Sequence, residues 1–229
     1  MIRQRYGGAQ RPETVLLAYL ADTSNSLATY PSIPDEATVL RGPFVTGFSD
    51  GEFFRFCQEN DQARIERTAK HEIIIMPPAG FESSAASMSA AGSLFIWHRQ
   101  HRQGKVLDSS VGYLLPDGAV LSPDASWVSP ERLTTVTPAQ LQKYPPLCPD
   151  FVIEIKLPSD RIPTLQVKME QWLRNGVRLG FLIDTESETA YVYAPGQPMR
   201  IVAGFENELS GEPVLSGFQL DLWELKGSA

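Results

Sequence analysis

From residue 49 onward, segments whose apolar residues recur at helical spacing alternate with segments whose apolar residues follow the pattern of a β-strand. Apolar residues at helical spacing predict helices over about 49–60, 83–103 and 164–175. The first begins with the capping-box residues Ser49 and Glu52, and the third ends at Gly176, where a helix terminus favours glycine. Apolar or alternating runs predict strands over residues 65–68, 72–76, 106–115, 119–121, 125–128, 151–157, 179–183 and 190–193. This order favours an α/β fold in which helices pack on a mixed β-sheet.

The first 45 residues show neither period. Residues 24–34 are rich in Ser, Thr and Pro, which is typical of a loop or an irregular arm. We therefore expect an N-terminal arm over residues 1–45 and one domain over residues 46–229. No apolar run approaches the roughly 18 to 20 residues that span a bilayer, and no apolar stretch follows the basic N-terminus as in a secretory signal. These features predict a cytoplasmic protein with no membrane partner.

The charge balance limits the kinds of partner. Twenty Lys and Arg against 27 Asp and Glu give a formal net charge of −7, which counts against a protein that coats nucleic acid through bulk charge. An enzyme with a local acidic metal site remains compatible with this balance. The two cysteines, Cys57 and Cys148, lie far apart without metal-ligand spacing and predict buried thiols in a reducing compartment. His98 and His101 lack a third ligand and are better read as a solvated helix end.

The predicted strand at 151–157 carries the most informative charges. Side chains alternate between the two faces of a strand, so Phe151, Ile153 and Ile155 share one face and form core. Glu154 and Lys156 share the other face, about 7 Å apart along the backbone. A carboxylate and an ammonium on a buried strand are costly unless they are paired or used in chemistry.

A second carboxylate would turn this pair into a metal site. Asp124 follows Pro123, opens the predicted strand at 125–128 and precedes Glu154 by 30 residues. Pro123-Asp124 followed by Glu154-Ile155-Lys156 matches the PD-(D/E)XK signature of nucleases. Mg²⁺ prefers oxygen ligands and retains waters, and a nearby lysine can orient a water or stabilise developing charge. The alternative interpretation of these three charged residues is a surface salt-bridge cluster.

Two other Pro-Asp dipeptides are weaker candidates. Asp117 precedes a glycine, which favours a turn. Asp150 lies on the same strand as Glu154 but about 13 Å from it, too far to share a metal ion. We expect Asp150 to order the entrance of the strand instead.

Lys168 and Glu82 each have two interpretations. Lys168 lies among Leu165, Met169 and Trp172 on the inward stripe of the predicted helix. Its stem could cover apolar surface while its head reaches solvent, or its ammonium could enter the acidic site and share or replace the role of Lys156. Glu82, near the start of the long helix, could ligate a metal or a water, or could simply favour the positive end of the helix dipole.

Several segments together resemble the Uma-two family of putative restriction endonucleases. The resemblance covers roughly residues 45–226 and rests on residues 67–78, 109–118, 122–128, 148–156, 158–160, 165–169 and 175–184. Two places depart from the family pattern. Residues 81–84 carry Phe, Glu and Ser where relatives are usually rich in Gly, and Leu157 replaces the usual Ser before Pro158.

The resemblance implies a restriction-endonuclease-like PD-(D/E)XK core, with a central mixed sheet flanked by helices. By this likeness Asp124 and Glu154 hold a metal ion with the backbone carbonyl of Ile155, and Glu82 matches a further acidic position. Lys156 matches the signature lysine, and Lys168 matches a helix lysine that many relatives carry.

The expected function is Mg²⁺- or Mn²⁺-dependent hydrolysis of DNA phosphodiester bonds, with Lys156 or Lys168 orienting the attacking water. A homodimer would allow both strands to be cut. The first alternative is a catalytically inactive nucleic-acid- or protein-binding module on the same fold. The second is a structural or regulatory oligomer whose acidic cluster is only an ion-pair network.

Overall fold

The computed structural model describes residues 37–226. Most of the predicted N-terminal arm, residues 1–36, lies outside the described residues. Strand β1 (Thr38–Leu40) pairs with β3 (Ile73–Met76), so regular structure extends into the part of the predicted arm that is described. No helix within residues 37–226 combines the length and the apolar character needed to span a membrane.

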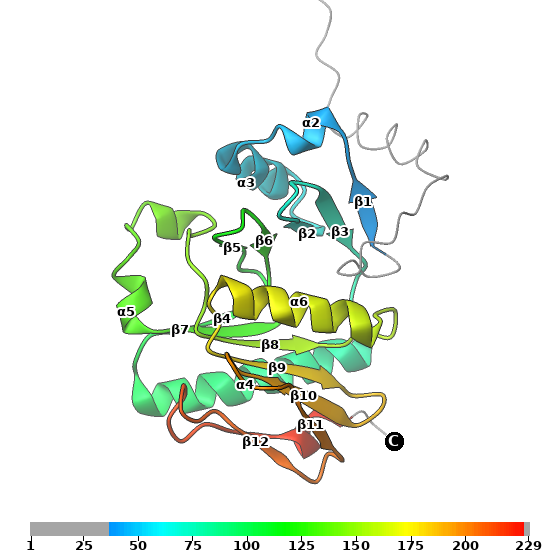
Figure 1. Ribbon diagram of the computed structural model, residues 1–229, viewed down its shortest axis with the longest axis vertical. Coiled ribbons are helices and arrows are strands. Elements are labelled where there is room, and N and C mark those ends of the chain that lie inside the picture. The colour runs from blue at the N-terminus through cyan, green and yellow to red at the C-terminus, as the bar shows by residue number, and fades with distance from the viewer. Residues whose placement is uncertain (1–36, 227–229) are drawn as a thin grey trace, which may run out of the picture. The chain divides into compact units, whose positions relative to one another are not determined.

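A six-stranded mixed sheet forms the centre of the fold (Figure 1). Its strands, in spatial order, are β11 (Arg200–Ala203), β10 (Thr189–Tyr193), β9 (Leu179–Asp184), β8 (Phe151–Ile155), β7 (Ala125–Val128) and β4 (Lys105–Asp108). Strands β8 and β9 run parallel, and every other neighbouring pair in this sheet is antiparallel. The predicted mixed α/β architecture is therefore confirmed.

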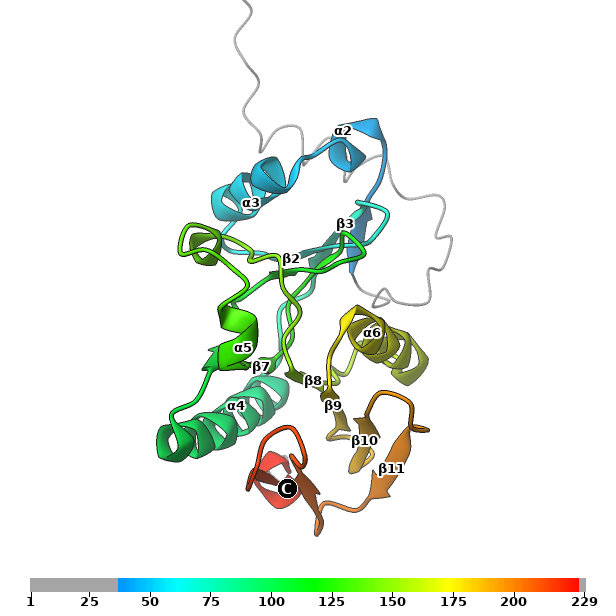
Figure 2. The same ribbon diagram turned by 60° about the vertical axis from the view of Figure 1, so that its left-hand side comes forward.

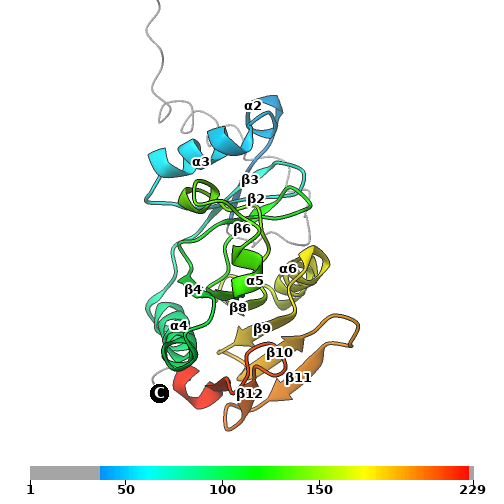
Figure 3. The same ribbon diagram turned by 90° about the vertical axis from the view of Figure 1, so that its left-hand side faces the viewer.

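Two long helices cover the two faces of this sheet. Helix α4 (Phe81–His101) packs on the face that carries Phe151, Ile153 and Ile155. Helix α6 (Ile162–Asn175) packs on the opposite face, where Val152 and Glu154 point. The C-terminal elements, which are the hairpin of β12 (Glu208–Ser210) and β13 (Gln219–Asp221) and the short helix η2 (Leu222–Leu225), pack on the α4 side. Figure 3 shows α4 and α6 on either side of the sheet.

A second sheet is built from five short antiparallel strands and lies above the central sheet in the view of Figure 2. Its order is β1, β3, β2 (Arg64–Arg67), β6 (Val120–Leu121) and β5 (Tyr113–Leu114). Helix α3 (Asp50–Glu59) starts with the predicted capping box, in which Ser49 and Glu52 exchange hydrogen bonds. The remaining short helices are α2 (Pro43–Thr46), α5 (Pro130–Leu133) and η1 (Gln140–Gln142).

The predicted single strand at 106–115 is wrong. The chain leaves β4 at Asp108 and enters β5 in the other sheet at Tyr113. The Asp108 carboxylate accepts hydrogen bonds from the backbone N–H and the hydroxyl of Ser110, which closes a turn between the two strands. The chain returns from β6 to β7 through residues 122–124, so this short link lies where the two sheets meet.

Candidate active site

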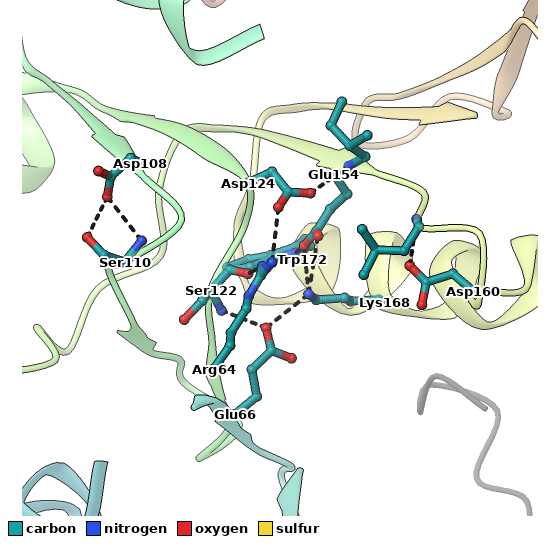
Figure 4. A network of polar contacts seen from close by, with 12 residues as sticks. Arg64, Glu66, Asp108, Ser110, Ser122, Asp124, Glu154, Asp160, Lys168 and Trp172 are labelled. Carbon is teal, nitrogen blue, oxygen red and sulfur yellow. Dashed lines mark hydrogen bonds and ion pairs between the residues drawn. The ribbon is translucent and has the colours of Figure 1, made fainter. Parts of the chain in front are cut away.

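Charged side chains from both sheets and from α6 meet around one small pocket (Figure 4). The pocket has a volume of about 20 Å³, which is enough for a water molecule or an ion. Its lining consists of Arg64, Glu66, Asp124, Glu154, Asp160 and Lys168, with Met76, Ile155, Leu157 and Leu165 as the other walls. The sequence prediction that Asp124, Glu154 and Lys168 could share one site therefore agrees with their positions.

Asp124, the aspartate of the predicted Pro-Asp motif, is held in place by backbone groups of β8 and by Arg64. Its backbone N–H donates to the carbonyl of Ile153 on β8 at 3.0 Å, and its Oδ2 accepts the backbone N–H of Ile155 at 2.7 Å. Its Oδ1 lies 3.1 Å from a guanidinium nitrogen of Arg64 on β2. These three contacts hold a buried carboxylate at the carboxyl end of β8, next to Glu154.

Glu154 is held by two residues of one helix. Its Oε1 accepts a hydrogen bond from the indole nitrogen of Trp172 at 2.8 Å and lies 3.0 Å from Nζ of Lys168. Lys168 and Trp172 are four residues apart, so both project from the same face of α6 toward β8. The helix thus sets the orientation of the Glu154 carboxylate.

Lys168 also joins the central sheet to the second sheet. Its Nζ lies 3.0 Å from Oε1 of Glu66 on β2, and the same oxygen accepts the backbone N–H of Ser122 at 3.0 Å. The side chains of Glu66, Glu154 and Lys168 are all less than a tenth exposed. A buried ammonium between two buried carboxylates is the central feature of the site.

The electrostatic balance of the pocket is acidic. Four carboxylates, those of Glu66, Asp124, Glu154 and Asp160, face the two cations of Arg64 and Lys168. Burial raises the pKa of Glu154 to about 7, and although Lys168 opposes this rise, the Asp124 and Glu66 carboxylates add to it. Burial by itself would lower the pKa of Lys168, but Glu154 and Glu66 outweigh burial and raise it. Lys168 is therefore a permanent cation at neutral pH.

Lys156 does not join this pocket. It follows the last residue of β8, and its Nζ lies 2.9 Å from Glu186 and 3.8 Å from Asp184 at the β9–β10 turn. The expected side-by-side placement of the Glu154 and Lys156 charged groups is not what the structure has. The backbone N–H of Lys156 still donates to the carbonyl of Ile183 on β9 at 2.8 Å, but its long side chain carries the ammonium to the acidic turn. The ammonium that contacts Glu154 belongs to Lys168.

The other predicted carboxylates lie elsewhere. Glu82 is exposed in the first turn of α4 and does not line the pocket. Asp117 accepts the backbone N–H of Ala119 in a turn, as expected. Asp150 accepts the backbone N–H of Ser129 and pairs with Arg132, so it orders the entrance of β8. Neither Asp117 nor Asp150 lines the pocket.

Three pocket residues were not singled out as site candidates from the sequence. Arg64 and Glu66 occupy alternate positions of the short strand β2, a pattern that places two charges on one face. Asp160 is buried, and its Oδ2 accepts the backbone N–H of Leu157. The alternation of charged residues in β2 could have indicated that Arg64 and Glu66 share one face of the strand. The neighbouring sequence did not indicate which strand or helix this face would contact.

The donor set of the pocket fits a hard divalent cation. Two carboxylates and a backbone carbonyl are oxygen ligands of the kind that Mg²⁺ and Mn²⁺ take alongside waters. Oδ1 of Asp160 is buried in the pocket wall and has no hydrogen-bond donor among residues 37–226, so this wall can accept further positive charge. Within the same described range, no group of three or more His, Cys, Asp or Glu side chains is placed to hold a metal ion, so a cation here would depend on two carboxylates, a backbone carbonyl and waters.

Comparisons with known proteins place the chain among nuclease-like folds. A crystal structure from Anabaena variabilis ATCC 29413, described as a putative nuclease belonging to DUF820, is similar with a TM-score of 0.61. The match has 19% sequence identity and covers 70% of this chain and 88% of that chain. The family Uma2, described as putative restriction endonuclease, matches residues 50–222, and the chain belongs to this family. No curated protein matches the chain.

Proposed function

We propose that the protein is a metal-dependent nuclease that hydrolyses phosphodiester bonds in DNA. The observation that carries this proposal is the buried set of Asp124, Glu154 and Lys168, held in one acidic pocket by backbone, indole and carboxylate contacts. Membership of the Uma2 family and the nuclease-like fold support the same reaction class.

Asp124 and Glu154, with the backbone carbonyl of Ile155, would hold Mg²⁺ or Mn²⁺. When bound, such an ion supplies Lewis acidity and lowers the pKa of a ligating water. Two backbone contacts and an indole already orient the two carboxylates. Arg64 contacts Oδ1 of Asp124 and Lys168 contacts both oxygens of Glu154, so a cation would have to share these oxygens with the two side chains or displace them.

The two cations of the pocket serve the anionic substrate. Lys168 is held between Glu154 and Glu66, so its ammonium can position the attacking water and stabilise charge that develops on a phosphate oxygen. Arg64, whose side chain is 29% exposed, is the cation at the rim of the pocket and can contact a phosphodiester that enters from solvent. The proposed roles thus place Lys168, rather than Lys156, at the reacting atoms.

A plasmid-nicking assay tests this function. Wild-type protein with Mg²⁺ or Mn²⁺ is expected to convert supercoiled plasmid to nicked or linear DNA, and excess chelator is expected to stop the reaction. Glu154→Gln, purified in the same way, reports any contaminating nuclease. If wild type and Glu154→Gln show equal activity, or if neither cleaves DNA with either metal, the proposal fails and a binding module on this fold becomes the better interpretation.

The raised pKa of Glu154 predicts a pH-dependent response to metal. The folded protein holds the Glu154 proton more tightly than the unfolded chain, because burial raises the pKa from 4.5 to about 7. This group therefore favours folding at low pH, and its contribution is lost as the pH rises through about 7. A cation binds the ionised carboxylate, so the rise in Tm caused by Mn²⁺ should be larger near about pH 8 than near about pH 6.

Differential scanning fluorimetry with and without Mn²⁺ measures this response. Glu154→Gln cannot ionise at this position, so we expect its Tm to show little dependence on the metal at either pH. Equal metal-induced shifts at both pH values in the wild type would contradict the assignment of Glu154 as a ligand.

A further inference from the structure

Helix α4 is apolar on two opposite faces. Ala86, Ala90, Leu94 and Trp97 are buried against the central sheet. Phe81, Met88 and Phe95 follow each other at intervals of seven residues and are 82%, 71% and 51% exposed. At 100° per residue these three lie on the side of the helix opposite the buried residues. Figure 3 views α4 nearly along its axis, with the sheet on one side of it.

Small residues separate the large ones on this exposed face. Ala85 and Gly92 lie between Phe81, Met88 and Phe95 at spacings of three and four residues, so they belong to the same stripe. A Cβ atom built on Gly92 would meet no atom within 4 Å, so packing inside the described chain gives no reason for glycine there. Glycine is a poor helix former, and its usual value in a helix face is the close approach of another backbone.

The charges of α4 are distributed unevenly along its length. The first turn carries Glu82, and the last turn carries His98, Arg99 and His101. Arg99 lies on the exposed stripe, whereas His101 stacks on the buried Trp97. Two such helices in antiparallel orientation would place Glu82 of each near Arg99 of the other. The opposed helix dipoles favour the same orientation.

We propose that two copies of this chain associate through the exposed face of α4, with the two helices antiparallel about a two-fold axis near residue 90. In this register the residue numbers that face each other add up to 180. Met88 then lies over Gly92 of the second copy, and Phe95 lies over Ala85 of the second copy. Phe81 meets Arg99 of the second copy, where a guanidinium can stack on an aromatic ring.

This self-complementarity identifies a second copy as the occupant of the face. Each large apolar residue meets a small residue or a cation when the helix is paired with itself in the antiparallel sense. A two-fold interface requires such a surface, because the same patch must fit its own copy. Ridges filling grooves between small residues also allow the close approach of two helices.

Sedimentation velocity of the full chain tests the association. Wild type is expected to sediment as a dimer at micromolar concentration. Met88→Glu and Phe95→Glu are each expected to weaken the dimer at least tenfold, because each places a carboxylate in the apolar seam. Ile201→Glu is the matched control, since Ile201 is an apolar residue 58% exposed on β11, outside α4. Its dimer should be unchanged.

Gly92→Leu separates association from folding. The side chain enters open space in a single copy and improves helix propensity, so the Tm measured on dilute protein should not fall. The dimer should nevertheless weaken at least tenfold, because the close approach of Met88 from the other copy is blocked. A monomeric wild type overturns the proposal, as does a dimer that survives Met88→Glu, Phe95→Glu and Gly92→Leu alike.

Cysteine crosslinking tests the antiparallel register. In a Cys57→Ala background, a mixture of Met88→Cys and Gly92→Cys proteins should form a disulfide-linked dimer on mild oxidation faster than either variant alone. Faster crosslinking of Met88→Cys with itself would indicate parallel helices and would overturn the proposed arrangement.

Discussion

A Lys168→Met variant is expected to lose DNA cleavage by at least about 100-fold, because it removes the cation that we propose stabilises charge on the reacting phosphate. The same change should lower the free energy of unfolding by about 3–5 kcal/mol, since it leaves two buried carboxylates without their common partner. The two carboxylates are those of Glu66 and Glu154, each 3.0 Å from the Lys168 nitrogen. Cleavage of plasmid and urea denaturation measure the two effects.

Lys156→Met is the matched control for this experiment. This variant also removes one positive charge, at the lysine that matches the nuclease signature. The ammonium of Lys156 lies beside the exposed Glu186 rather than in the pocket. We expect cleavage to stay within about threefold of wild type. Stability should fall less than in Lys168→Met, because the Lys156 side chain is 9% exposed but its nearer partner Glu186 is 76% exposed. Lys168→Arg retains the charge and should preserve more stability than Lys168→Met. A greater loss of cleavage in Lys156→Met than in Lys168→Met would reverse the assignment of the lysine.

Asp124→Asn and Glu154→Gln are each expected to reduce cleavage by about 100- to 1000-fold. Each replacement retains an oxygen that can accept the existing hydrogen bond, from the Ile155 N–H for Asp124 and from the Trp172 indole for Glu154. Each replacement also removes an ion pair, with Arg64 for Asp124 and with Lys168 for Glu154, so the loss of cleavage is compared with the Tm of each variant measured without metal. The change in Tm on addition of Mn²⁺ should disappear in both variants.

Asp117→Asn provides the comparison for the carboxylates. Asp117 also follows a proline, but it closes a turn outside the pocket. We expect this variant to cleave DNA and to respond to Mn²⁺ as the wild type does. If Asp124→Asn behaved like Asp117→Asn in both measurements, the acidic pocket would not be the active site.

Much of the central sheet could be predicted from local sequence. The alternation of apolar residues defined β7 and β8, and the apolar stripe with its terminal glycine defined α6, because burial and capping act over short distances. The transition between sheets at Asp108 was missed. The segment 106–115 contains Asp108, Ser109, Ser110 and Gly112, which are typical turn residues, and the prediction of one strand did not take them into account.

Only the part of the site that depends on the alternation of side chains along one strand could be predicted from the sequence. Alternation correctly placed Glu154 away from the Phe151 face. It could not locate the ammonium of Lys156, whose backbone still pairs with β9 while its long side chain extends to Glu186. A lysine stem is flexible, so the nearest carboxylate outside the strand decides where the ammonium lies. Glu66 could not be assigned from sequence because its partner Lys168 is 102 residues away, and the contact depends on how the two sheets meet.

The same separation has a consequence for synthesis on the ribosome. Glu66 emerges from the exit tunnel 102 residues before Lys168, the cation that neutralises it in the folded protein. Burying Glu66 before α6 is available would leave a carboxylate in the interior with no ammonium beside it, which is strongly unfavourable. We therefore expect the strands of the second sheet to complete their docking only after α6, which is translated much later, becomes available. A nascent chain stalled before residue 168 should expose this acidic strand to proteases that the finished protein resists.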